Sequence, residues 1–112
     1  MPIVCRREDI KAESGKEVRI DSEQGVTWLM LFVCDSEVLA YQNSCPHEGR
    51  ALNFAPDRFI LTKEGQLVCP HHGATFELSN GLCVSGPCKG RSLKPFAVSV
   101  VDGEVSVGDS SD

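Results

Sequence analysis

Two short blocks of cysteine and histidine constrain this chain more than any other feature. The first block is Cys45-Pro46-His47, and the second is Cys69-Pro70-His71-His72-Gly73. Each block pairs a thiolate donor with an imidazole donor beside a proline or glycine turn. Thiolate and imidazole are common metal ligands in proteins, so together the two blocks indicate a single metal site.

A Cys/His quartet of this kind has two plausible occupants: one structural zinc ion, or a cluster of two irons and two sulfides. Zinc sites usually take their ligands as Cys-x2–4-Cys and His-x3–5-His pairs, each pair from a single turn. Here each block would supply one Cys ligand and one His ligand, which suits two loops that bind a binuclear cluster from opposite sides. The spacing favours the cluster, and zinc remains the alternative.

The sequence around these blocks resembles the small soluble Rieske ferredoxins over nearly the whole chain. The matching stretches are Ser44–Gly49, Cys69–Phe76, Asn80-Gly81 and Ser85-Gly86-Pro87, ahead of Leu93 and Pro95. The resemblance implies one [2Fe-2S] cluster per chain, with Cys45 and Cys69 on one iron and His47 and His72 on the other. It also implies that Gly86-Pro87 belongs to a proline loop that covers the cluster.

The expected fold follows from the same resemblance. It is mainly β, a Rieske fold of antiparallel sheets with a small cluster-binding subdomain formed by the two ligand loops. We expect one domain over residues 1–112, with the subdomain at about 43–88. A chain of 112 residues has room for one modest core.

Alternation and turn residues predict the individual strands. A long apolar run, Trp28–Val33, is typical of a buried strand, and we expect Trp28, Phe32 and Tyr41 in the core. Residues 50–54 are expected to form a short helix, and the polar tail, 108–112, is expected to be frayed. The remaining expected strands are Ile3–Arg6 and Glu17–Ile20 around a polar turn, Glu37–Gln42, Phe59–Thr62, Gln66–Val68, Thr75–Leu78, Leu82–Val84, Ala97–Val101 and Glu104–Val107.

Sixteen Asp and Glu against 11 Lys and Arg argue against a nucleic-acid partner and favour a basic docking partner. Four charged residues are expected near the cluster end and are candidates for steering that partner: Glu48, Arg50, Lys89 and Arg91. No signal peptide precedes the first strand, and the apolar run is too short to span a bilayer. We therefore predict a cytoplasmic protein with no membrane partner.

The other four cysteines are expected to be thiols. A Cys83–Cys88 disulfide would stiffen the proline loop, but a reducing cytoplasm favours two free thiols. Cys5 and Cys34 are expected to be small buried apolar residues.

The ligand set predicts the redox chemistry. Two neutral imidazoles in place of two thiolates raise the potential above that of an all-cysteine cluster. High-potential Rieske proteins add a disulfide between the ligand loops and hydroxyl donors after the second histidine. Here Arg50 and His71 occupy the disulfide positions, and Ala74 and Phe76 occupy the hydroxyl positions. We therefore expect a potential of roughly zero to −150 mV.

The leading functional hypothesis is a one-electron carrier, the ferredoxin component that passes electrons from a flavin-dependent reductase to an oxygenase or similar terminal enzyme. Only His71 remains beyond the cluster, too few histidines for an oxygenase's own iron site, so we expect no catalytic residues. The alternatives are an accessory subunit similar to that of assimilatory nitrite reductase, and a zinc-stabilised interaction module.

Overall fold

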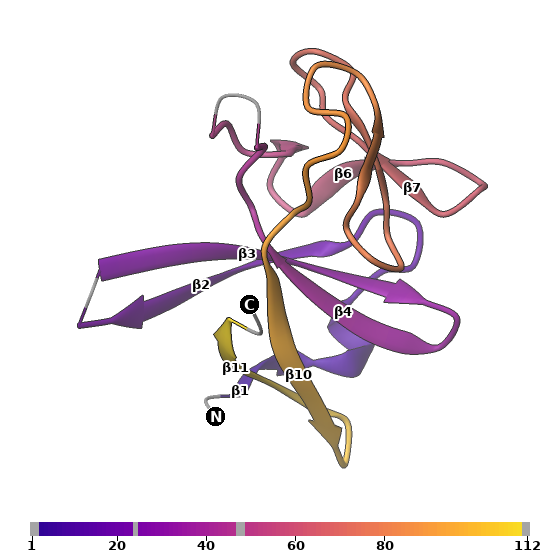
Figure 1. The fold of residues 1–112 in the computed structure, drawn as a ribbon. Helices are drawn as coiled ribbons and strands as arrows, with labels where there is room; N and C mark the ends of the chain where they lie inside the picture. The colour runs from indigo at the N-terminus through magenta and orange to yellow at the C-terminus, as the bar shows by residue number, and fades with distance from the viewer. Residues whose placement is uncertain (1–2, 24, 47–48, 111–112) are drawn as a thin grey trace.

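Two antiparallel sheets make up most of the computed structural model, which describes residues 3–23, 25–46 and 49–110 (Figure 1). The first sheet has six strands in the order β1-β11-β10-β4-β3-β2. They are β1 (Ile3–Arg6), β2 (Lys16–Ser22), β3 (Gly25–Cys34), β4 (Glu37–Gln42), β10 (Pro95–Val101) and β11 (Glu104–Ser110). The mainly β, antiparallel architecture is therefore confirmed.

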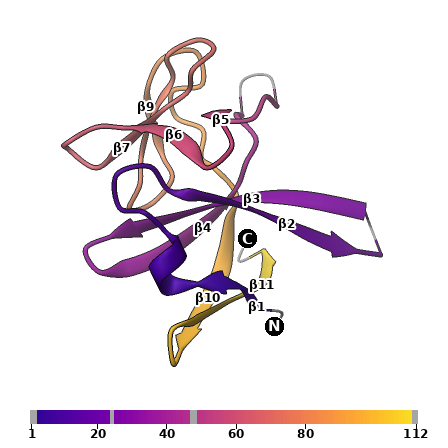
Figure 2. The ribbon, with the colours of Figure 1, turned by 180° about the vertical axis from the view of Figure 1, so that it is seen from behind.

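The second sheet has five strands in the order β5-β6-β7-β8-β9. They are β5 (Asn53–Ala55), β6 (Arg58–Leu61), β7 (Gln66–Val68), β8 (Thr75–Glu77) and β9 (Cys83–Ser85). All five lie in sequence between β4 and β10, which pair with each other in the first sheet. The second sheet is thus an insertion that stands on one side of strands β2, β3 and β4, with β1, β10 and β11 of the first sheet on the other side (Figures 1 and 2).

A single turn of 3-10 helix, η1 (Arg7–Asp9), follows β1. No helix within the described ranges is long and apolar enough to cross a membrane.

Strand β3 contains the continuous apolar run seen in the sequence, and the middle of the strand is buried on both faces. Leu29, Met30, Leu31 and Phe32 are all at most 1% exposed. Side chains alternate along a strand, so the two faces of β3 contact different cores. Met30 and Phe32 face the core shared with the second sheet, which we call the first core, whereas Leu29 and Leu31 face a second core beside β11. This double burial explains why the run is apolar without alternation.

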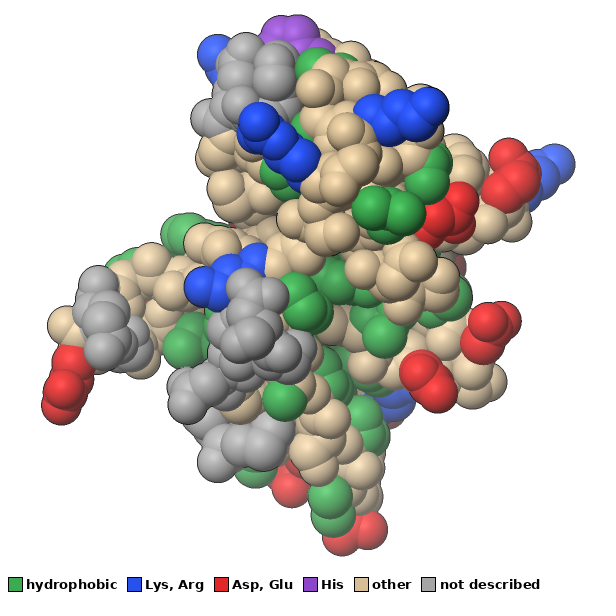
Figure 3. Space-filling model, in the orientation of Figure 1, with side chains coloured by type: hydrophobic (Ala, Val, Ile, Leu, Met, Phe, Trp, Pro, Cys, Tyr) green, Lys and Arg blue, Asp and Glu red, His purple; other side chains and the backbone are tan. Residues whose placement is uncertain are grey.

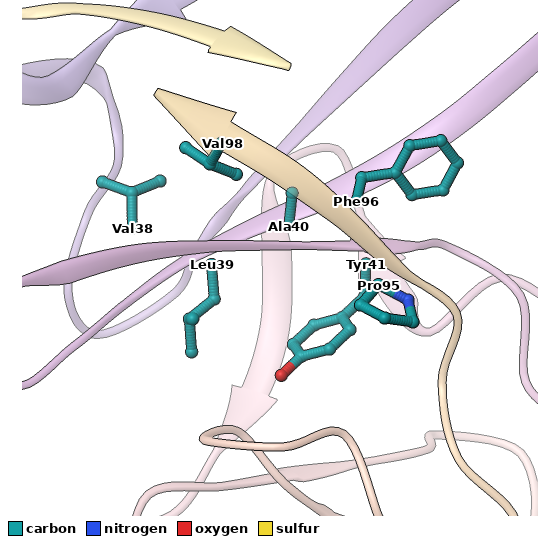
Figure 4. A pocket seen from close by; sticks show the side chains of 7 residues that line it. All are labelled: Val38, Leu39, Ala40, Tyr41, Pro95, Phe96 and Val98. Atoms are coloured by element: carbon teal, nitrogen blue, oxygen red, sulfur yellow. The ribbon is translucent and has the colours of Figure 1, made fainter. Parts of the chain in front are cut away.

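Strand β4 divides its side chains between the same two cores. Tyr41 and Leu39 point toward the second sheet, whereas Ala40 and Val38 point the other way, to the side of β4 on which Val98 and Phe96 of β10 lie (Figure 4). Only Pro95 and Phe96 of β10 pair with β4, and the two strands then diverge around a hollow. Across the first core, the rings of Phe32 and Phe59 meet edge to face, with centroids 5.2 Å apart, and join the two sheets.

Three local expectations were wrong. Trp28 is 46% exposed, because the β2–β3 hairpin projects beyond the rest of its sheet (Figure 1). Residues 50–54 form no helix: Leu52 and the start of β5 are hydrogen-bonded to Asn43 and β6. The tail is ordered as far as the structure describes it, because β11 extends to Ser110 and Phe96 pairs with that residue.

The two strands expected at 3–6 and 17–20 are present in the structure. The first pairs with β11 and the second with β3.

A tyrosine in the first core links the two sheets. The Tyr41 hydroxyl donates a 2.6 Å hydrogen bond to the Leu78 carbonyl, and the side chain is buried. We expect Tyr41→Phe to lower the free energy of unfolding by about 1 kcal/mol at pH 7, because the carbonyl loses its donor. Denaturant unfolding of both proteins checks this value.

The stability difference between the wild type and Tyr41→Phe should depend on pH. Burial raises the pKa of Tyr41 from 10.0 to about 12. Below pH 10 the phenol is neutral in both states, but as the pH rises from 10 to 12 the unfolded chain ionises first, so this part of the stability is lost. The difference between the wild type and Tyr41→Phe should therefore shrink over that window. A difference that stays constant from pH 7 to 12 would contradict the buried, neutral phenol.

Candidate metal centre

The first ligand loop begins where β4 ends, and it closes on itself through two backbone hydrogen bonds. The Cys45 amide donates to the Arg50 carbonyl at 2.8 Å, and the Gly49 amide donates to the Cys45 carbonyl at 2.7 Å. Gly49 has φ +73°, a conformation that glycine adopts without strain. The Cys45 side chain is 3% exposed. The expected ligand His47, with Glu48, lies outside the described residues.

The second ligand loop, between β7 and β8, repeats the same turn. The Cys69 amide donates to the Ala74 carbonyl at 2.8 Å, and the Gly73 amide donates to the Cys69 carbonyl at 3.1 Å. Gly73 has φ +74°, and Cys69 is 3% exposed. The two loops are therefore equivalent: in each, the cysteine amide bonds five residues ahead and a glycine four residues ahead bonds back.

The equivalence was missed from sequence, although a signal for it was present. Both blocks have the spacing Cys-x-x-x-Gly, as Cys45 to Gly49 and Cys69 to Gly73. The histidines sit at different offsets within the shared turn, two residues after Cys45 and three after Cys69. The two cysteines therefore occupy the same position in matching turns.

The proline loop, residues 85–91, joins the two ligand loops. Gly86 packs on the second loop so tightly that a Cβ atom built on it would lie 2.7 Å from the Cα of Ala74. On the first loop, the Arg91 guanidinium donates a 3.0 Å hydrogen bond to the carbonyl of Pro46, the residue before His47. The expected cover therefore contacts both loops.

A third buried sulfur lies beside Cys45. The Cys88 thiol donates to Cys83 Sγ at 3.2 Å, and it also lies within hydrogen-bonding reach of Cys45. Burial raises the pKa of Cys88 to about 12, and the hydrogen bond to Cys83 adds to the effect. Cys88 is therefore a neutral thiol at pH 7. Cys83 and Cys88 are free thiols in this structure, as expected, whereas Cys5 and Cys34 are half-buried instead of buried.

The donor set suits a cluster that faces the protein on one side and solvent on the other. Cys45 and Cys69 are buried among the apolar side chains of the first core, whereas His72 and its neighbour His71 are exposed. Thiolates in an apolar setting and imidazoles at the surface match the two kinds of iron site in such a cluster. Among the described residues, no three His, Cys, Asp or Glu side chains are grouped so that they could hold a metal ion.

Ala74 and Phe76, the two positions where hydroxyl donors were considered, offer no hydrogen-bond donor from their side chains. Ala74 and Phe76 are 0% exposed and belong to the first core. In the high-potential proteins described above, a disulfide joins the two ligand loops. Here Arg50 and His71 occupy the two corresponding positions, and both side chains are exposed. Cluster sulfur near Ala74 and Phe76 would receive no hydroxyl hydrogen bond from them.

A buried amide anchors the start of the first ligand loop. The Asn43 Oδ1 atom accepts from the Leu52 amide at 2.6 Å, and its Nδ2 donates to Glu17 Oε2 at 2.8 Å and to Asn53 Oδ1 at 2.9 Å. Asn43 is 7% exposed. These bonds tie the loop to β2 on one side and to β5 on the other.

We expect Asn43→Asp to lower the free energy of unfolding by about 3 kcal/mol, because a carboxylate oxygen would then face two other acceptors. The matched control is Asn80→Asp, since Asn80 is exposed and only accepts a bond, from the Leu82 amide at 2.9 Å. That change should cost less than about 0.5 kcal/mol. Urea unfolding measures both, and equal losses would contradict the anchoring role of Asn43.

Comparisons with known proteins identify the family to which this chain belongs. The family model for the Rieske [2Fe-2S] domain matches residues 1–102. The chain belongs to this family, and its cofactor is a [2Fe-2S] cluster. A search of the curated proteins found no match.

Solved structures with a similar fold include two ferredoxins and a chain from an oxygenase–ferredoxin complex. One is the ferredoxin of carbazole 1,9a-dioxygenase from Nocardioides aromaticivorans IC177, with 21% identity, a TM-score of 0.74 and coverage of 95% of this chain and 94% of that chain. The ferredoxin of Sphingomonas yanoikuyae B1 has 22% identity, a TM-score of 0.75 and coverage of 96% and 97%. A third is a chain in the complex of reduced oxygenase and oxidized ferredoxin in carbazole 1,9a-dioxygenase, with 25% identity, a TM-score of 0.74 and coverage of 95% and 90%.

Proposed function

We propose that this protein is a one-electron carrier whose [2Fe-2S] cluster is held by Cys45 and Cys69 on one iron and by His47 and His72 on the other. The observation that carries the proposal is the pair of equivalent turns, each presenting one buried cysteine and closed by the same two backbone hydrogen bonds. When bound, such a cluster takes up and releases a single electron.

The chain's own residues give this site the rigidity that electron transfer requires. Each ligand loop is closed by its own hydrogen bonds, and the proline loop contacts both of them. The thiols are packed among apolar side chains that exclude water. A site held in this way changes little between oxidation states. The exposed His72 lies where a partner protein could approach the cluster.

We propose that the partners are a flavin-dependent reductase as donor and an oxygenase or similar enzyme as acceptor. Two similar structures are named as ferredoxins, and a third belongs to an oxygenase–ferredoxin complex. We also propose a cytoplasmic location. The structure describes all six cysteines and joins none of them in a disulfide, which fits a reducing compartment. The single domain with a cluster-binding subdomain at about 43–88 is part of the same proposal.

Protein-film voltammetry tests the carrier function. We expect one reversible one-electron wave at roughly zero to −150 mV, because Ala74 and Phe76 donate no hydrogen bond to the cluster. Phe76→Tyr, which restores a hydroxyl at that position, should raise the potential. The exposed Phe54→Tyr should leave it unchanged. A value above about +200 mV would contradict the argument from missing donors, and no reversible wave would contradict the carrier function.

A further inference from the structure

Charge is unevenly divided between the end of the molecule that carries the ligands and the remainder. We define the cluster-end loops as residues 43–52, 69–74 and 85–91, the segments that hold the four proposed ligands and the proline loop. They contain three of the 11 Lys and Arg residues and one of the 16 Asp and Glu residues. Their formal charge is therefore +2 and that of the remaining chain is −7, which together give the net charge of −5.

The basic side chains of these loops lie on the surface. Arg50, Lys89 and Arg91 are all exposed, as are His71 and His72. Figure 3 shows Lys, Arg and His side chains gathered over the upper end of the molecule, whereas the Asp and Glu side chains visible in this view lie at its sides and lower part. The bond from Arg91 to Pro46 ends on an uncharged carbonyl and so does not itself neutralise the guanidinium charge.

Screening makes this local charge more important than the net charge. The Debye length is about 10 Å at 0.1 M salt. The molecule is 37 Å along its longest axis. A partner that docks at the cluster end is therefore close to the positive loops, whereas charges at the far end of a molecule of this size are strongly screened.

We propose that the cluster-end loops are a docking surface for a redox partner whose own docking face is acidic. This inference rests on the proposed function and reverses the expectation of a basic partner that the net charge suggests. An acidic face is attracted at the cluster end and repelled by the rest of the surface. Charge therefore directs the partner to the side of the molecule where an electron can leave.

The test uses two small oxidants of opposite charge as probes of the field at the cluster end. Ferricyanide is a trianion, and tris(phenanthroline)cobalt(III) is a trication. Each gains the one electron that the reduced protein loses. Stopped-flow mixing at low ionic strength gives the second-order rate constants. For the wild type, we expect the rate constant with ferricyanide to fall as salt is added and that with the cobalt complex to rise.

Two charge-reversal variants distinguish the effect of local charge on the rate from the effect of net charge. Lys89→Glu changes the proline loop, whereas Lys63→Glu changes the exposed β6–β7 turn at the other end of β7 from Cys69. Both lower the net charge by two. We expect Lys89→Glu to slow the reaction with ferricyanide about fivefold at low salt and Lys63→Glu to slow it less than about twofold.

The possible outcomes separate the docking proposal from the proposed electron-carrier function. Equal effects of the two reversals, or salt dependences of the opposite sign, would overturn the basic docking surface while leaving the one-electron carrier intact. A protein that cannot be reduced by one electron would instead overturn the proposed function.

Discussion

Replacing Cys69 with alanine should abolish the metal centre. We expect iron and acid-labile sulfide to fall from about two each per chain to nearly zero, with loss of the visible absorption. The physical reason is that Cys69 supplies one of two thiolates to one iron, and the buried position offers no water to replace it. Metal analysis of the purified variant measures the loss.

The control is Cys34→Ala, which removes a half-buried thiol outside the ligand loops and should keep the full iron content. If Cys69→Ala fails to fold, His72→Ala provides the test, because His72 is exposed and its removal leaves no cavity in the core. Full iron content in both Cys69→Ala and His72→Ala would refute the proposed ligand set.

Adding a methyl group at Gly86 should separate the proline loop from the second ligand loop. The new Cβ would lie 2.7 Å from the Cα of Ala74, a backbone atom that cannot move aside cheaply. Gly86 also has φ +96°, which is strained for alanine. We expect Gly86→Ala to lower the free energy of unfolding by about 3 kcal/mol and to speed the loss of iron to a chelator.

Gly90→Ala is a closely matched control in the same segment. Gly90 has φ +93°, but no atom lies within 4 Å of a Cβ built on it. This variant should show only the backbone strain, about 1 kcal/mol, and wild-type iron release. If the two variants were equally stable and lost iron equally fast, contact between Gly86 and Ala74 would not hold the cover in place.

The sequence identified the family and the antiparallel β architecture because the diagnostic residues are close together in it. Two Cys/His blocks, each beside proline or glycine, can be read without knowing any long-range contact. The strands around them alternate or end at turn residues, as with β6 and β7 on either side of Gly65. Local chemistry and local periodicity are the information that a sequence shows directly.

The errors arose where neighbours in space decide the outcome. Trp28 looked like a core residue, but burial depends on whether other strands cover the end of its hairpin. Leu52 and Asn53 had no strong strand pattern, yet the Leu52 amide bonds to Asn43 and Asn53 pairs with Phe59 at the start of β5, so no helix forms. The last residues of β11 are polar and ordered by pairing with β10. In each case tertiary contacts override the local preference.

Three features of the site could be found only in three dimensions. The contact of Gly86 with Ala74, the bond from Arg91 to Pro46 and the approach of Cys88 to Cys45 each join residues far apart in sequence. The uneven charge is a different case: the sequence contains it, but the overall acidic composition concealed the basic end until the charges were counted by segment.

The most direct test of the central claim is the iron, zinc and sulfide content of the purified chain, together with an EPR spectrum after dithionite reduction. We predict about two irons and two sulfides per chain, no stoichiometric zinc, and the low average g value of a histidine-ligated cluster. One zinc and no sulfide, persisting after anaerobic reconstitution with iron and sulfide, would contradict the account and identify the two loops as a structural zinc site.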